Sequence, residues 1–264
     1  KCGAGLYIMG RDWEAYPTVR NCTLAHNTAR NYGGGAMVNG TGDGSVAPRF
    51  VQCRFENNRS LNSGGGLAWL GSAWVQRDGD IDSCAFIANH AAFNGAGAYY
   101  SDAERTDNPD ISASTFISNN AERNGGALYI ASGRSYGTNI FITGSDFRGN
   151  TASDGAALFL TTENLSYTNN VVIDRSNFIE NSTFSHINPS LIVIVPIFLE
   201  SSNCKIMNAE INYNIARSRI LNIDGGAGLR CVLFKLSAKF NSTISAIFHQ
   251  ASFSNAIFDN IYFY

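Results

Sequence analysis

Four aspartates are the side chains of this 264-residue chain best placed for chemistry: Asp78, Asp80, Asp82 and Asp110. The first three occupy alternate positions, and alternate positions of a β-strand share one face. Asp80 and Asp110 each stand six residues before a phenylalanine of a sequence repeat, so a repeating fold would stack their carboxylates. At about 5 Å, two such charges repel by roughly 3 kcal/mol at an effective dielectric near 20. This repulsion favours a bound cation or a raised carboxyl pKa.

Two kinds of site would use this acidic group. Calcium prefers carboxylate oxygens, so the four aspartates are candidate Ca²⁺ ligands. A polysaccharide-active enzyme of the lyase or glycoside hydrolase type would use Asp80, Asp110 and Asp82 as catalytic groups. The third interpretation is a solvated acidic loop beside Arg77 and Arg105. No other cofactor is indicated, because the four histidines are scattered and no nucleophile accompanies them.

The elements that would position these aspartates belong to the repeat. Every 30 or 31 residues an asparagine follows an apolar residue by three positions. The asparagines are Asn27, Asn58, Asn89, Asn119, Asn150 and Asn181, and the apolar residues are Leu24, Phe55, Phe86, Phe116, Phe147 and Phe178. Such repeats stack because none can bury its apolar face alone. We therefore expect the phenylalanines in the core and the asparagines in a hydrogen-bonded ladder at a left-handed corner.

A second apolar column and a glycine-rich corner complete each repeat. The second column lies five residues before the first: Val19, Phe50, Ile81, Ile111, Ile142 and Ile173. Glycine accepts positive φ, so corners such as 33–35 and 125–126 suit tight turns. Three short strands per coil of about 31 residues, without helical periodicity, predict an all-β, right-handed parallel β-helix. We expect regular coils over residues 1–183 and degenerate coils of the same solenoid over residues 184–264.

The cysteines also follow the repeat. Cys22, Cys53 and Cys84 each stand two residues before its apolar residue, and later repeats place serine there. This column predicts a buried ladder of small side chains. Stacked strands lie about 4.8 Å apart, within the Cα range of a disulfide, so a bond between adjacent members is an alternative. Cys204 and Cys231 form a second candidate pair.

An aromatic column follows the glycine corners. Its members stand two residues beyond the alanine or leucine after each corner: Tyr7, Val38, Trp69, Tyr100, Tyr129 and Phe159. Residues two positions apart in a strand lie on the same face, so these members share a face with the small residues, and we expect them to point inward. An outward stripe would instead favour carbohydrate binding.

Charge and hydropathy exclude two partners. The formal net charge is −2 and the basic residues are dispersed, so neither nucleic acid nor anionic lipid is an expected partner. The longest apolar run, residues 191–199, is too short to span a bilayer and contains Pro196, which indicates a buried strand and no direct membrane insertion.

Sequons occur at Asn21, Asn39, Asn58, Asn164, Asn181 and Asn241, and Asn58 and Asn181 belong to the asparagine column. Asn39, Asn164 and Asn241 are the candidate glycosylation sites. Such sites are used in extracellular or cell-surface proteins. The chain also opens on Gly3-Ala4-Gly5, in the middle of a repeat, so we expect a segment of a longer protein.

The paired motifs resemble the repeats of the chlamydial polymorphic outer-membrane proteins and of similar large extracellular surface proteins. Gly34-Gly35-Ala36 and Gly125-Gly126-Ala127 carry the glycine half. The Phe-x-x-Asn half begins at Phe86, Phe116, Phe147 and Phe178. The resemblance covers residues 3–183 and implies a parallel β-helix involved in adhesion. Leu24 departs from the Phe half.

These observations favour a non-enzymatic structural or adhesive rod, or a filament component, in a larger extracellular or cell-surface protein. Its expected partners are other protein chains or further coils, with carbohydrate as an additional candidate. The alternatives are a polysaccharide-active enzyme and a carbohydrate-binding β-helix.

Overall fold

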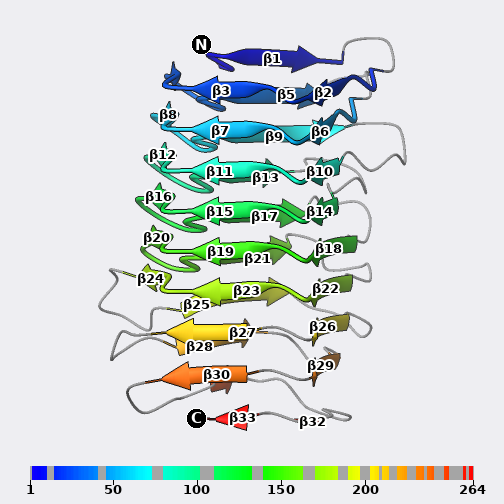
Figure 1. Cartoon of the computed structure of the whole chain (residues 1–264), viewed down its shortest axis with the longest axis vertical. Coiled ribbons are helices and arrows are strands. Elements are labelled where there is room, and N and C mark those ends of the chain that lie inside the picture. The colour runs from blue at the N-terminus through cyan, green and yellow to red at the C-terminus, as the bar shows by residue number, and fades with distance from the viewer. Residues whose placement is uncertain are drawn as a thin grey trace.

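The computed structural model describes residues 2–10, 15–40, 46–72, 80–101, 110–132, 139–162 and 170–183, and from residue 190 onward only the backbone of the strands. Its coils stack along one long axis, with the two ends of the chain at opposite ends of the stack (Figure 1). All strand pairs are parallel, and each strand pairs with its equivalents in the coils before and after it. The chain is a parallel β-helix.

Three sheets of nine strands run the length of the described solenoid. The first sheet contains β1 (Leu6–Met9), β5 (Ala36–Gly40), β9 (Leu67–Ser72), β13 (Ala98–Ser101), β17 (Leu128–Ser132), β21 (Leu158–Thr162), β25 (Ser190–Pro196), β28 (Arg219–Asp224) and β31 (Ile247–His249). The second contains β2 (Thr18–Arg20), β6 (Arg49–Val51), β10 (Asp80–Asp82), β14 (Asp110–Ser112), β18 (Asn139–Thr143), β22 (Asn170–Asp174), β26 (Asn203–Met207), β29 (Arg230–Phe234) and β32 (Phe258–Asp259). The third contains β3 (Thr23–Ala25), β7 (Arg54–Glu56), β11 (Ala85–Ile87), β15 (Thr115–Ile117), β19 (Asp146–Arg148), β23 (Asn177–Ile179), β27 (Glu210–Tyr213), β30 (Ser237–Phe240) and β33 (Tyr262–Phe263).

A fourth sheet, of six two-residue strands, corrects the expectation of three strands per coil. It contains β4 (Thr28–Ala29), β8 (Arg59–Ser60), β12 (His90–Ala91), β16 (Asn120–Ala121), β20 (Thr151–Ala152) and β24 (Ser182–Thr183). Each strand follows a ladder asparagine directly, and backbone bonds such as Arg59 N–H to Asn27 O (2.8 Å) join one coil to the next. The two residues after each ladder asparagine thus pair with their equivalents in the neighbouring coils before the glycine corner begins.

The corners differ in one detail from the sequence expectation. The left-handed residue is the one before the ladder asparagine, not the asparagine itself: His26, Asn57, Ala88, Ser118, Gly149 and Glu180 have φ between 50° and 61°. At the glycine-rich corner the left-handed position is held by glycine in five successive coils: Gly33, Gly64, Gly95, Gly125 and Gly155. There a Cβ would lie within 2.6 Å of a backbone carbonyl oxygen or neighbouring Cβ, so no other residue fits.

The asparagine ladder is confirmed. The backbone N–H and the Nδ2 amide of Asn58 both donate to Oδ1 of Asn89, at 3.0 and 3.1 Å. Asn89 Nδ2 in turn donates to the Phe55 carbonyl at 2.9 Å and to Oδ1 of Asn119 at 3.0 Å. The pattern repeats without a break from Asn27 to Asn181. Each amide therefore binds the coil before it and the coil after it.

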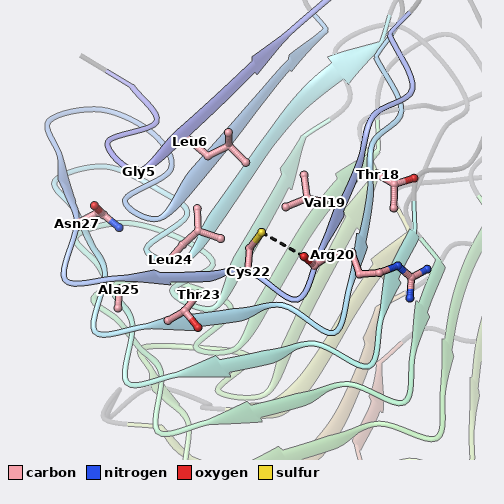
Figure 2. Close-up of a pocket in the computed structure, with 10 residues that line it drawn as sticks. All are labelled: Gly5, Leu6, Thr18, Val19, Arg20, Cys22, Thr23, Leu24, Ala25 and Asn27. Atoms are coloured by element: carbon pink, nitrogen blue, oxygen red, sulfur yellow. Dashed lines mark hydrogen bonds between the residues drawn. The ribbon is translucent and has the colours of Figure 1, made fainter.

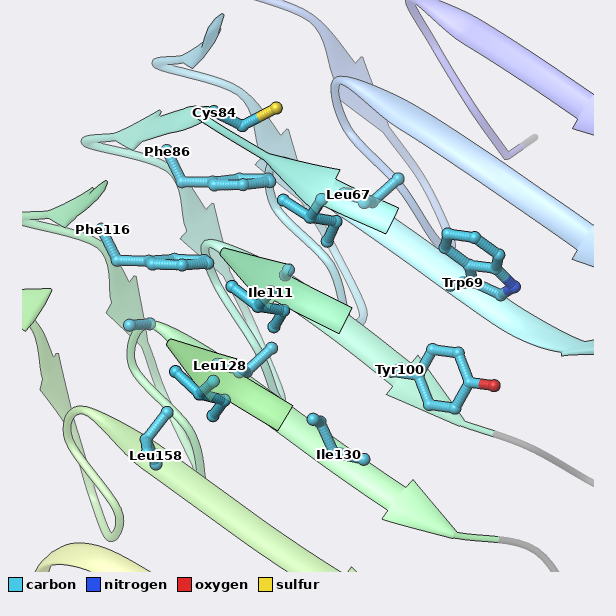
Figure 3. Packing of buried hydrophobic residues seen from close by; sticks show 14 of the residues in the cluster. Leu67, Trp69, Cys84, Phe86, Tyr100, Ile111, Phe116, Leu128, Ile130 and Leu158 are labelled. Carbon is cyan, nitrogen blue, oxygen red and sulfur yellow. The ribbon is translucent and has the colours of Figure 1, made fainter. Parts of the chain in front are cut away.

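The phenylalanine core is confirmed as well. Phe55, Phe86, Phe116, Phe147 and Phe178 are all fully buried. Their rings stack with centroids 4.6–4.9 Å apart and planes within 7° of parallel. Figure 3 shows Phe86 above Phe116, with Leu67, Ile111 and Leu128 from the other two large sheets packed against them. The core is thus a column of layers, one layer per coil.

The cysteine and serine column is a third ladder. The Cys53 N–H donates to Cys84 Sγ at 3.4 Å, and the Cys84 N–H donates to Ser114 Oγ at 3.0 Å. The thiols of Cys53 and Cys84 also donate to a carbonyl of the preceding coil, Val19 O at 3.2 Å and Phe50 O at 3.3 Å. Cys22, Cys53 and Cys84 are free thiols in the structure. Cys204 and Cys231 lie opposite each other in β26 and β29.

Replacing Phe116 by alanine is expected to lower the free energy of unfolding by about 3 to 5 kcal/mol, because the neighbouring rings cannot close the cavity. Phe141→Ala is the control, since Phe141 is 41% exposed on an outer face, and about 1 kcal/mol or less is expected there. Urea unfolding of the purified chain measures both. Equal losses would refute the core assignment.

Replacing the adjacent residues Asn119 and Asn120 by alanine, one at a time, measures what the ladder contributes to the free energy of unfolding. Asn119→Ala removes the acceptor of the Asn89 N–H and Nδ2 and the donor to the Phe86 carbonyl, all buried. We expect a loss of about 3 to 5 kcal/mol, since each buried orphan costs roughly 1 to 3 kcal/mol. Asn120→Ala removes only an outer bond to Thr151, so a loss below about 1 kcal/mol is expected in the same urea titration. A smaller loss for Asn119 than for Asn120 would contradict the ladder's role.

Candidate functional site

The outward side of the first sheet is the most distinctive surface of the described residues, and we call it the aromatic face. Two columns of outward positions follow it in β1, β5, β9, β13, β17 and β21: Tyr7, Met37, Ala68, Tyr99, Tyr129 and Phe159 in one, and Met9, Asn39, Leu70, Ser101, Ala131 and Thr161 in the other. Met37 and Ala68 are buried, so the accessible part of the first column is Tyr7 at one end and the half-buried rings of Tyr99, Tyr129 and Phe159 at the other. None of these residues is charged. Charge-depleted, aromatic surfaces are typical of contact sites.

The residues expected from the sequence to form one aromatic column belong to two columns, one that points inward and one that points outward. Val38, Trp69 and Tyr100 point inward and are at most 3% exposed, as Figure 3 shows for Trp69 and Tyr100. Tyr129 pairs with Tyr99, not with Tyr100, and Tyr7 is 44% exposed, so these members point outward. The inward expectation is wrong for Tyr7, Tyr129 and Phe159.

The error comes from the glycine corner. Ala127 stands two residues after the left-handed Gly125, at the place that Gly35 holds after Gly33. Aligning Ala127 with Ala36, which stands three residues after Gly33, shifts the strand by one residue. A one-residue shift exchanges the two faces of a strand. Alignment on the left-handed glycine would have found Tyr99 as well.

Most of the outward aromatic rings stack on one another. The Tyr99 and Tyr129 centroids lie 5.3 Å apart with planes at 15°, and Tyr129 and Phe159 lie 5.3 Å apart at 6°. Tyr32, which precedes the glycine corner, stacks on Tyr99 at 6.0 Å and extends the column. Nearly parallel rings at this separation overlap face to face. Their faces are therefore occupied by each other, and their edges form the surface.

This orientation bears on the expectation of carbohydrate binding. A sugar ring stacks on the exposed face of an aromatic ring, and the faces of Tyr99 and Tyr129 are covered by their neighbours. Ring edges and hydroxyls are better suited to packing against apolar and polar side chains of a protein. This side of the first sheet thus presents ring edges and hydroxyls instead of open ring faces.

The first coil adds a polar network to the aromatic face. Asn39 Nδ2 donates to the Tyr7 hydroxyl at 2.8 Å, and this hydroxyl donates to Met9 Sδ at 3.8 Å. Asn39 is partly exposed, and its glycosylation stays a prediction. Asn164 and Asn241 lie outside the described residues. The sequon asparagines Asn58 and Asn181 are buried in the ladder.

The acidic group lies on the outer side of the second sheet. Asp80 and Asp110 are direct neighbours in β10 and β14, as the repeat predicts. Arg49 Nε donates to Asp80 Oδ2 at 2.5 Å, and Asp82 Oδ1 accepts bonds from the hydroxyls of Ser83 and Ser112 at 3.0 and 3.2 Å. Asp80 therefore has an arginine partner, and Asp82 has two hydroxyl donors. An exposed ion pair of this kind contributes less than about 1 kcal/mol.

The calcium hypothesis stays a prediction. Asp78 lies outside the described residues. Within the described ranges, no three His, Cys, Asp or Glu side chains gather as metal ligands do. No described helix is long and apolar enough to cross a membrane.

A hollow of about 670 Å³ opens at the first coil (Figure 2). Leu6, Val19, Leu24, Cys22 and Asn27 line it, so it borders the core side of the first described coil. The Cys22 thiol donates to the Arg20 carbonyl at 3.2 Å beside it. The hollow contains no constellation of catalytic groups among its lining residues.

His90 is the histidine with a perturbed pKa. Burial lowers its pKa, and Arg59 in the neighbouring strand lowers it further, whereas Glu122, with Oε1 3.6 Å from Nε2, opposes both. Its other neighbour in the fourth sheet is Asn120. The pair of His90 and Glu122 includes no nucleophile, so we interpret it as a surface interaction and not as a catalytic pair.

Replacing Asp80 and Asp110 together by asparagine tests the acidic group. We expect a shift of the melting temperature of no more than about 2 °C, because only an exposed ion pair and a like-charge contact are removed. Added Ca²⁺ is expected to leave the melting temperature of both proteins unchanged. A calcium-dependent rise in the parent chain that the double variant lacks would instead establish a metal site.

Comparison with models of protein families, with curated proteins and with solved structures found no match. The likeness to the chlamydial surface-protein repeats therefore stays a resemblance in the Gly-Gly-Ala and Phe-x-x-Asn motifs. The parallel β-helix itself follows from the geometry of this chain.

Proposed function

We propose that this chain is a non-enzymatic structural or adhesive rod of a larger extracellular or cell-surface protein. The observation that carries the proposal is the unbroken asparagine ladder from Asn27 to Asn181, which joins six successive coils. Such a ladder supports a straight, regular body, whereas a catalytic cleft is usually built from irregular loops.

The rod makes its contacts through the aromatic face. The other outward surfaces carry charge: Arg49 and Asp80 on the second sheet, Arg54 and Glu56 on the third, and Arg59 on the fourth. Burying such charges in an interface costs desolvation. The aromatic face has no charge to desolvate and offers rigid rings that are already ordered by stacking.

The partner that fits this face best is a second rod of the same kind. Two such faces share the coil spacing of about 4.8 Å, so the ring edges of one can pack in register against the ring edges of the other. Lateral packing of this kind would make the chain a filament component. The loops 39–49, 71–80, 101–110 and 131–139 are further contact candidates, and they lie largely outside the described residues.

Extracellular placement is part of the same proposal. The partly exposed sequon at Asn39 supports it, as does the resemblance of the repeats to those of surface proteins. Asn39 lies on the aromatic face itself and already bonds Tyr7. A glycan there would cover the first coil of the face and leave Tyr99, Tyr129 and Phe159 open.

Placing charge on the aromatic face tests the proposed function. Tyr129→Lys and Phe159→Lys are expected to weaken self-association at least about tenfold, since each lysine must lose water in the contact. Thr115→Lys, on the outer side of the third sheet, is the control and is expected to leave association unchanged. Sedimentation velocity over a wide concentration range measures the association constant.

Two results would overturn the contact face. One is a parent chain that stays monomeric at millimolar concentration, and the other is an association that Thr115→Lys weakens as much as Tyr129→Lys does. Melting curves of all three variants separate a lost contact from a lost fold. The parent chain is also assayed for cleavage of a polysaccharide. If it shows this activity and the Asp80→Asn, Asp110→Asn variant loses it, the rod proposal is wrong and the chain is an enzyme.

A further inference from the structure

Two tyrosines stand next to each other on the outer side of the first sheet, within the regular coils. Tyr99 in β13 and Tyr129 in β17 are direct register partners, and each strand also pairs with a further strand on its other side (Figure 1). Both residues are half-buried, so part of each ring is open to solvent. Their ring centroids lie 5.3 Å apart with planes at 15°. The fold therefore holds two phenols side by side on an accessible surface.

We propose that Tyr99 and Tyr129 are an oxidative cross-linking site, at which a peroxidase with hydrogen peroxide joins the two rings as dityrosine. The bond forms within one chain, so the proposal does not depend on self-association of the rod. A one-electron oxidant converts a phenol to a phenoxyl radical, and two such radicals combine only where their rings meet. Holding the two reactants next to each other raises their effective concentration by many orders of magnitude. The stacking therefore selects this pair.

The two rings need only a small movement to react. Because they belong to register partners and are nearly parallel, the ring carbons ortho to the hydroxyls lie about as far apart as the centroids do. Reacting atoms must come within about 3 to 3.5 Å of each other, so the ring edges must approach by roughly 2 Å. Partly exposed side chains make such movements by rotation about their own bonds. The strands β13 and β17 can therefore keep their register during the reaction.

The neighbours of the pair limit the reaction to one main product. Phe159 stacks on the other side of Tyr129 at 5.3 Å, but phenylalanine has no hydroxyl and forms no phenoxyl radical. Tyr32 stacks on the other side of Tyr99, with a larger separation of 6.0 Å and a larger interplanar angle of 25°. Tyr100, the residue after Tyr99, points inward and is 2% exposed. Tyr129 is therefore the best-placed partner of Tyr99.

The reaction removes one electron and one phenolic proton from each tyrosine. Each radical shares its unpaired electron between the oxygen and the ortho carbons, and one ortho carbon of each ring forms the new C–C bond. The hydrogen on each of these carbons then moves to the phenolic oxygen of the same ring, which restores both aromatic rings and both hydroxyls. Hydrogen peroxide takes up the two electrons and the two protons and is reduced to two molecules of water. The product thus lacks two hydrogens and joins two neighbouring coils covalently.

Peptide mapping of the oxidised chain tests the proposal. The full chain is treated with a peroxidase and hydrogen peroxide, at a dilution at which sedimentation shows a monomer, and is then digested with trypsin. Cleavage after arginine places Tyr99 in the peptide 78–105 and Tyr129 in the peptide 124–134. The expected product is these two peptides joined with the loss of two hydrogens, from chains that still run as monomers on a denaturing gel. A main product that joins two chains, or that joins 78–105 to the Tyr32 peptide 31–49, would overturn the proposal.

Phenylalanine variants identify the pair, because they keep the stacked ring and remove only the hydroxyl. Tyr99→Phe and Tyr129→Phe are each expected to lower the yield of the joined peptides at least about tenfold, since the remaining phenol has lost its stacked partner. Tyr100→Phe is the matched control, because Tyr100 lies in the same tryptic peptide as Tyr99, and an unchanged yield is expected. A yield that falls as far in Tyr100→Phe as in Tyr99→Phe would contradict the assignment.

A gain of reactivity is expected from Phe159→Tyr, which places a third phenol in the stack. The peptide 124–134 should then also join to the peptide 149–175, which contains position 159. The same stacking distance of 5.3 Å on both sides of Tyr129 explains this expectation. Absence of the second product from the folded variant would show that stacking in this column does not direct the coupling.

Discussion

Each coil of this protein must stand in register with its neighbour, and from Asn27 to Asn181 the buried asparagine amide enforces that constraint. One amide hydrogen binds a carbonyl of the preceding coil, as Asn89 does with Phe55, and the other binds the next asparagine. A shift of one residue would leave these polar groups buried and unpaired, at roughly 1 to 3 kcal/mol each. The parallel sheets, the phenylalanine stack and the thiol ladder all follow from this register.

The same constraint separates inward from outward columns. The two innermost ladders repeat one residue type or one size, because each side chain packs on its own equivalent about 4.8 Å away: phenylalanine on phenylalanine, serine on cysteine. The inward column of Val38, Trp69 and Tyr100 is more varied. Outward positions are free to vary, and on the second sheet Arg49, Asp80 and Asp110 succeed one another in a single column. An outward column that nevertheless keeps aromatic rings over successive coils, as Tyr99, Tyr129 and Phe159 do, is therefore informative about contact.

The sequence allowed the main columns to be predicted because their spacing is set by strand geometry. Asn and Phe recur at 30 or 31 residues, and the structure stacks them as expected, along with Asp80 on Asp110. The aromatic face could not be placed correctly, since its assignment depended on which residue of each glycine corner is left-handed. The fourth sheet was missed because two residues are too few for a periodic pattern. The residues around Asp78 lie outside the described ranges, so the calcium hypothesis rests on the sequence alone.

The fourth sheet shows how the corner residues set the length of a coil. It ends at β24 in the described chain, whereas the other three sheets continue to β31, β32 and β33. Cys204 and its partner Cys231 are 27 residues apart, and Leu233 and Phe258 are 25 apart, against 30 or 31 in the regular coils. The shorter spacing begins where the described fourth sheet and the asparagine ladder end. In the regular coils the asparagine and glycine corners therefore bound an additional side, and the three large sheets run through both kinds of coil.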